Sequence, residues 1–149
     1  MRAVKPFGAL DRATILLIGH DPRLQRSDAE AEVALFMNYL LRPKPGQRSE
    51  ARKYELAQAV LHYVAELAGR EVRLEELFVT NLCNEFLPHA PAGATVLIPD
   101  AQAQRGVQEI ARTVAAGRFR VVLPMSQQVF YRYASSALWK TGLSWLSTS

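Results

Sequence analysis

The clearest pattern along the chain is the sequence ILLIGHDP at residues 15–22, where four consecutive apolar residues are followed by Gly, His, Asp and Pro. An uninterrupted apolar run is typical of a parallel strand that is buried on both faces. Gly19 permits a sharp turn, and Pro22 fixes the backbone where the loop leaves it. We therefore expect a strand over residues 13–19 that presents Asp21 at its carboxyl end, where open α/β sheets bind their ligands.

Two further segments have the character of strands. Leu77–Asn81 is apolar until it ends in the polar pair Thr80 and Asn81, and Phe119–Leu123 is a third short segment that is apolar except for Arg120. Parallel strands end at the same edge of a sheet, so Asp21 and Asn81 are expected on one rim. Residues 140–149 are too short for both a full edge strand and a functional loop, which leaves a final edge strand open.

Apolar residues at helical spacing predict helices that alternate with these strands. Their expected ranges are 28–41, 49–68, 102–116 and 126–138. Ser27 and Glu30 form a capping box before the first helix, and Gly69 is placed to end the second. Alternating strands and helices predict a three-layer α/β/α fold with a short parallel sheet, in a single domain over residues 1–149.

Composition is that of an ordinary globular domain: 149 residues, of which 49% are hydrophobic and 21% charged. No apolar stretch approaches the roughly 20 residues that span a bilayer, and the first residues lack a signal-peptide core. Cys83 is the single cysteine, which excludes an intrachain disulfide and favours the cytoplasm. The net charge of +4 is compatible with a polyanionic partner and is weak evidence for one.

Three segments together resemble the uracil-DNA glycosylase superfamily: Gly19-His20-Asp21-Pro22, Val79-Thr80-Asn81 and the strand Val121–Leu123 that runs on to Ser126. In that superfamily the first strand ends in a G-x-D-P or related loop that carries a catalytic Asp or Asn. A later strand ends in an Asn that recognises the Watson–Crick edge of uracil, and the sheet has four strands. The resemblance extends over about residues 14–133 and implies excision of a flipped uracil or related damaged base from DNA.

The resemblance implies a catalytic role for Asp21. Cleavage of an N-glycosidic bond gathers positive charge on the deoxyribose, and a carboxylate near the anomeric carbon stabilises it and orients water. The alternative for Asp21 is an Asx-turn that satisfies N–H groups of its own loop.

The resemblance also implies contacts to the flipped base. Asn81 would accept from N3–H of uracil and donate to O4, a pattern that cytosine reverses. The alternative for Asn81 is a hydrogen bond to the adjacent loop, and Asn84 is a weaker candidate for the same role. Phe36 lies where an aromatic ring would stack on the base, but it also fits the apolar face of its own helix.

The remaining candidates line the same rim or carry positive charge. Gly19, His20 and Pro22 would contact the substrate, and Ser126 would either hold a phosphate at a helix N-terminus or cap its helix. The candidates for contact with DNA phosphates are Arg23, Arg42, Lys44 and Arg48. A solvated basic loop, which would also include Arg52 and Lys53, is the alternative. No metal is expected, because His20 and His89 have no second ligand at a metal-binding spacing, and no cofactor is expected, because nothing resembles a Walker phosphate loop or a G-x-G-x-x-G turn.

The sequence departs from the superfamily at two places. Arg23 stands where the best-matched branch has a Tyr that bars the thymine methyl group, and no H-P-S-like motif follows Tyr133. The chain is therefore either a C-terminally shortened member or a divergent one, and its activity as an enzyme is left open. Two alternatives remain: a non-catalytic module of the same fold that binds nucleic acid or a nucleobase, and a different hydrolase that uses Asp21 and His20. DNA is the expected partner, with no membrane association.

Overall fold

The computed structural model describes residues 3–20, 32–85, 98–125, 129 and 144–145. The strands are β1 (Ile15–Gly19), β2 (Leu77–Asn81), β3 (Val121–Pro124) and β4 (Ser144–Trp145). The α-helices are α1 (Arg48–Ala68) and α2 (Asp100–Ala116), and the 3₁₀ segments are η2 (Ala34–Leu41) and η3 (Leu74–Glu76).

Within the described residues the strands form one parallel sheet in the order β2-β1-β3-β4. β1 lies between β2 and β3 in the sheet. After β1 the chain forms β2 on one side, and it then crosses to the other side of β1 to form β3. The edge strand that the sequence left open is present as β4, whose two residues pair with Val121 and Val122. A switch in strand order of this kind places a crevice at the carboxyl ends of the two strands.

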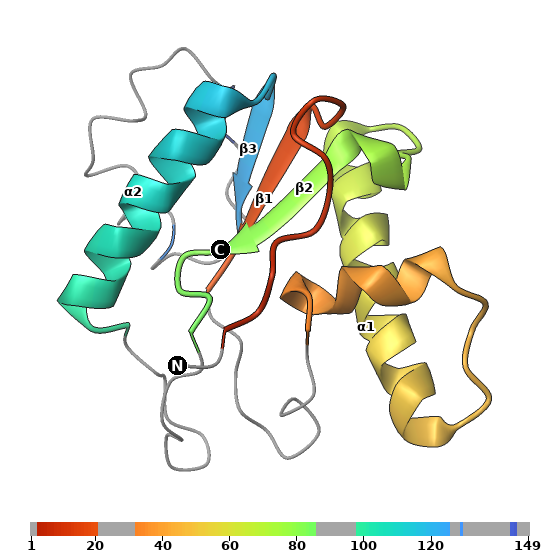
Figure 1. Ribbon diagram of the computed structural model, residues 1–149. Helices are drawn as coiled ribbons and strands as arrows, with labels where there is room; N and C mark the ends of the chain where they lie inside the picture. The colour runs from red at the N-terminus through yellow and green to blue at the C-terminus, as the bar shows by residue number, and fades with distance from the viewer. Residues whose placement is uncertain (1–2, 21–31, 86–97, 126–128, 130–143, 146–149) are drawn as a thin grey trace.

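Helices cover both faces of the sheet, as Figure 1 shows for α1 and α2. Successive residues of a strand point to opposite faces, and the core divides accordingly into two clusters. The cluster under α2 includes Leu16, Ile18, Phe78, Val122, Ala103 and Ile110. The cluster under α1 includes Ile15, Leu17, Leu77, Val79, Ala57 and Val64. The α/β/α layering predicted from the sequence is confirmed at this level.

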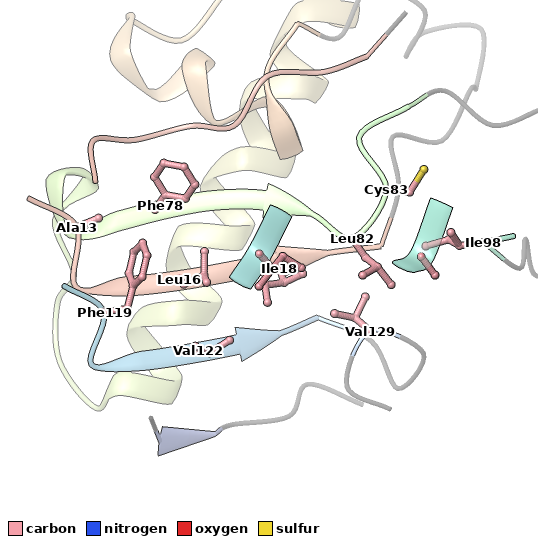
Figure 2. Close-up of a cluster of buried hydrophobic side chains, with 12 residues drawn as sticks. Ala13, Leu16, Ile18, Phe78, Leu82, Cys83, Ile98, Phe119, Val122 and Val129 are labelled. Carbon is pink, nitrogen blue, oxygen red and sulfur yellow. The ribbon is translucent and has the colours of Figure 1, made fainter. Parts of the chain in front are cut away.

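Close approach of α2 to the sheet depends on a glycine. A Cβ on Gly106 would lie 1.7 Å from the carbonyl oxygen of Leu82, which follows β2. Figure 2 shows Leu82 in the cluster under α2, with Ile18 of β1 and Val129. At the other end of this cluster the rings of Phe78 and Phe119 pack with their centroids 5.9 Å apart.

The N-terminal segment runs beside the outer edge of β2, a contact that the sequence did not predict. Phe7 and Val79 exchange two backbone hydrogen bonds of 2.8 Å in antiparallel geometry. Gly8 then has a φ of +109°, and a Cβ there would lie 2.3 Å from the carbonyl oxygen of Leu77. In Figure 1 the segment passes along β2 before the chain enters β1. It thereby covers the side of β2 that β1 leaves open.

The helix predicted over residues 28–41 is only partly confirmed in the part that the structure describes. Val33 is extended and bridges to Lys5, and the helical turns over Ala34–Leu41 are of the 3₁₀ type. Leu35 and Phe36 have left-handed backbones, with φ of 52° and 57°. The apolar spacing correctly marks side chains that pack under this segment, but pairing with the N-terminal segment overrides helix formation there. The capping box at Ser27 and Glu30 lies outside the described residues.

The other helix predictions agree closely with the structure where it describes them. Gly69 ends α1 in the left-handed conformation, with a φ of 68°, and its N–H bonds to helix carbonyls. α2 begins two residues earlier than expected and ends at the predicted Ala116. Most of the fourth predicted helix, 126–138, lies outside the described residues, and Val129, which the structure does describe, is buried. No helix among the described residues is long and apolar enough to cross a membrane.

Candidate functional site

β1 and β2 end side by side, with Gly19 and Asn81 as register partners. The pairing continues past the strands: the Leu82 N–H donates to the Gly19 carbonyl at 2.8 Å, and the Cys83 N–H donates to the His20 carbonyl at 3.1 Å. These backbone bonds fix the start of both loops, so the chain enters residue 21 from a defined position.

The third strand ends at the same edge of the sheet. The carboxyl ends of β1, β2 and β3 together form the rim. The Met125 N–H donates to the Ile18 carbonyl at 2.9 Å, directly beyond β3. β1 therefore ends between the loops that follow β2 and β3, at the switch in strand order. This is the position at which open α/β sheets bind ligands.

The side chain of Asn81 is the most informative feature of this rim. Asn81 is 3% exposed, and its Oδ1 atom has no hydrogen-bond partner among the described residues. A buried acceptor without a partner costs about 1–3 kcal/mol, and native structures contain few of them. The amide oxygen is therefore suited to receive a hydrogen bond from a ligand.

Gly19 makes room for that oxygen. A Cβ at residue 19 would lie only 2.3 Å from Oδ1 of Asn81. The amide therefore fills the space that the side chain of any other amino acid at position 19 would occupy. The glycine predicted from the sequence to allow a turn thus has a second role, because it lets the Asn81 side chain lie across the end of β1.

Asn84 holds the Asn81 backbone in place. Its Oδ1 accepts the Asn81 N–H at 3.2 Å, and its Nδ2 donates to Oγ1 of Thr80 at 3.1 Å. These two bonds use both the oxygen and the nitrogen of the Asn84 side-chain amide, and both join it to the end of β2. Asn84, the weaker sequence candidate for base recognition, therefore positions the Asn81 backbone. The amide oxygen of Asn81 itself has no hydrogen-bond partner among the described residues.

Phe36 lies in the cluster under α1, half-buried. Its ring meets Tyr39 edge-on at 6.1 Å, and Nζ of Lys53 lies 6.0 Å from its centroid. The residue beside it, Leu35, reaches closer to the rim: its Cδ2 lies 3.7 Å from the point where a Cβ on Gly19 would be. The pattern of the sequence indicated Phe36 and missed Leu35.

A partly buried polar cluster joins η2 to α1. Lys53 is 6% exposed, and its ammonium group donates to Oε1 of Glu50 at 3.2 Å. The Tyr39 hydroxyl donates to the other Glu50 oxygen, Oε2. Burial and the hydrogen bond to Glu50 raise the pKa of Tyr39, whereas the bonds from Tyr39 and Lys53 lower the pKa of Glu50.

The sequence interpretation of Lys53 as part of a solvated basic loop is therefore wrong. Its three-residue spacing from Glu50 on one helix face was the signal that could have indicated a paired lysine.

The basic candidates for DNA contact on the η2–α1 connection are exposed. Arg42, Lys44 and Arg48 all lie on the surface. Arg42 is placed 5.2 Å over the ring of Tyr39, and Lys44 pairs with Glu55 at 3.1 Å. Exposed pairs of this kind contribute little to stability, so Lys44 can exchange Glu55 for another anion.

Of the remaining candidates, the structure describes His20. His20 is half-buried at the rim, one residue after β1. Asp21, Pro22, Arg23 and Ser126 lie outside the described residues. In the described ranges, no group of three His, Cys, Asp or Glu side chains comes together in a way that could hold a metal ion.

Comparison with protein-family models gives no match for this sequence, and comparison with curated proteins gives no match either.

Proposed function

We propose that the chain is a uracil-DNA glycosylase-like domain that cleaves the N-glycosidic bond of a flipped uracil or related damaged base. The observation that carries the proposal is the buried, unpartnered amide oxygen of Asn81, which lies over Gly19 at the carboxyl end of β1. Two residues after Gly19 the chain reaches Asp21, the candidate catalytic carboxylate.

An acceptor without a partner favours a base that offers a donor. Uracil presents N3–H, which can donate to Oδ1 of Asn81, and its O4 can accept from the other end of the amide. Cytosine presents an acceptor at N3, which would face Oδ1 without a hydrogen between them. A matched pair of hydrogen bonds is worth roughly 1–3 kcal/mol of discrimination between bases.

Asp21 supplies the chemistry in this proposal. As the glycosidic bond breaks, positive charge grows on the deoxyribose and negative charge on the departing base. A carboxylate at the sugar stabilises the first and holds the attacking water. In the sequence, Asp21 comes two residues after Gly19, the last residue of β1 and the register partner of Asn81.

The sheet gives further support. Parallel strands in the order β2-β1-β3-β4, with helices on both faces, agree with the four-stranded sheet that the resemblance implies. Exposed Arg42 and Arg48 would contact phosphates, together with Lys44 after it leaves Glu55. Binding to DNA through such contacts weakens as salt concentration rises.

The experiment compares base release by wild type and Asn81→Ala from matched oligonucleotides that contain uracil or cytosine. We expect wild type to release uracil and to leave cytosine, and Asn81→Ala to release uracil at least about tenfold more slowly. Asn38→Ala, which removes a half-buried amide from η2, is the matched control and should keep the wild-type rate. Equal rates of uracil release for Asn81→Ala and wild type would refute base recognition by Asn81.

The same rim also suits a module that binds a nucleobase without cleaving it. The basis for this second candidate is that the Asn81 amide over Gly19 would recognise a base whether or not its glycosidic bond is cleaved. Asn81-dependent binding of uracil-containing DNA without release of uracil would support the binding module over the enzyme.

A further inference from the structure

Two consecutive left-handed residues open η2, and neither is glycine. Leu35 and Phe36 are the non-glycine residues with positive φ in the part of the chain that the structure describes. Side chains with a Cβ are disfavoured in this conformation, and such strain persists where the surrounding structure enforces it. The surrounding structure thus holds Leu35 and Phe36 in a backbone conformation that residues with a Cβ disfavour.

Backbone pairing on the N-terminal side enforces the conformation. The Ala34 N–H donates to the Lys5 carbonyl at 2.9 Å, and the Lys5 N–H donates to the Glu32 carbonyl at 2.8 Å. The segment that contains Lys5 is itself bonded to β2 through Phe7 and Val79. Residue 34 is therefore fixed relative to the sheet, and the left-handed turn directs the chain into η2 from there.

The consequence is that Leu35 reaches the rim. Its Cδ2 and the Oδ1 of Asn81 both lie within 4 Å of the same point above Gly19. The amide oxygen and the end of this branched aliphatic side chain therefore both lie next to the open space over Gly19, and the aliphatic group offers the oxygen no hydrogen bond. An apolar neighbour also excludes the water that would otherwise hydrate this acceptor.

We propose that Leu35 determines specificity by keeping the Asn81 amide oxygen free of water, so that only a base with an N–H donor satisfies it. This inference rests on the proposed function of the rim and adds a residue to it. When the acceptor is dry, a ligand donor does not compete with water, and a base that lacks the donor leaves the acceptor unpaired. With Leu35 truncated, water reaches Oδ1 and the preference for uracil weakens.

The test is a double-mutant cycle between Leu35→Ala and Asn81→Ala, measured as kcat/KM for uracil release. Alanine retains the Cβ and hence the backbone strain, so the substitution removes only the end of the side chain. We expect Leu35→Ala to lower kcat/KM about tenfold when Asn81 is present and less than about twofold when residue 81 is Ala. Leu35→Met, which keeps the volume, should restore most of the rate.

Leu40→Ala is the matched control, because Leu40 is also a partly buried leucine of η2. It should change kcat/KM by the same factor in both backgrounds. Equal losses for Leu35→Ala in both backgrounds would overturn the inference and leave the proposed function standing.

If wild type binds uracil-containing DNA without cleaving it, the same cycle is measured in dissociation constants. If wild type neither releases uracil nor prefers uracil over cytosine in binding, the proposed function fails and this inference fails with it.

Discussion

The amide oxygen of Asn81 occupies the space beside β1 that a side chain on Gly19 would fill. The two residues are register partners at the ends of parallel strands, and a Cβ on residue 19 would lie 2.3 Å from Oδ1. The glycine and the asparagine therefore form one unit, in which the missing side chain of the first provides the position of the second.

Gly19→Ala should displace the Asn81 side chain. We expect uracil release to fall at least about tenfold and the free energy of unfolding to fall by about 1–3 kcal/mol, the usual cost of overpacking a core site. Gly46→Ala is the control, because nothing lies within 4 Å of a Cβ there, and its stability should stay within about 0.5 kcal/mol of wild type. Wild-type activity and stability in Gly19→Ala would contradict the assigned position of the amide. Urea unfolding and base-release assays measure both effects.

Gly106→Ala tests the packing of α2. Alanine in a helix interior is favoured over glycine by about 1 kcal/mol, so propensity alone predicts a more stable protein. The new Cβ would, however, lie 1.7 Å from the carbonyl oxygen of Leu82, and backbone on both sides must move. We expect the clash to dominate and the net free energy of unfolding to fall by about 1–3 kcal/mol. A variant more stable than wild type in urea would show that α2 is not held this close.

The Tyr39–Glu50 hydrogen bond predicts a dependence of stability on pH. Hydrogen bonds from Tyr39 and Lys53 lower the pKa of Glu50 from its ordinary value of 4.5, and Arg42 acts in the same direction. Because the folded-state pKa is the lower one, the stabilisation is complete above about pH 4.5 and is lost as pH falls through the folded-state pKa.

Tyr39→Phe should therefore destabilise the protein more at pH 6 than at pH 3, because only the ionised Glu50 receives the full benefit of the bond. Tyr63→Phe, a half-buried tyrosine of α1, should have the same effect on the free energy of unfolding at both pH values. An equal effect of Tyr39→Phe at both values would argue against a stabilising role of this bond in the folded state.

The sequence predicts the strands well, because local composition determines them. The apolar runs that end at Gly19 and Asn81 form β1 and β2, and both strands are completely buried, as a sheet covered on two faces requires. Gly69 also ends its helix as predicted, since a left-handed C-cap is a local property of glycine.

Other features depend on parts of the chain that are distant in sequence. The antiparallel pairing of Phe7 with Val79 and the bridge of Lys5 to Val33 have no local signal, yet they determine where η2 begins. The left-handed backbone at Leu35 follows from this pairing and contradicts the helical spacing around it. At the rim, the sequence indicates Asn81, but the missing hydrogen-bond partner of its Oδ1 and the position of Leu35 near Gly19 are visible only in the fold.

A base-release assay shows whether this rim excises uracil. Uracil-containing single-stranded and duplex oligonucleotides are incubated with wild type and with Asp21→Asn, and free uracil is measured. We expect wild type to release uracil and Asp21→Asn to lose at least about a hundredfold in rate, because the substitution removes the charge that stabilises the sugar. No release by wild type, or equal release by both proteins, would contradict the proposed mechanism.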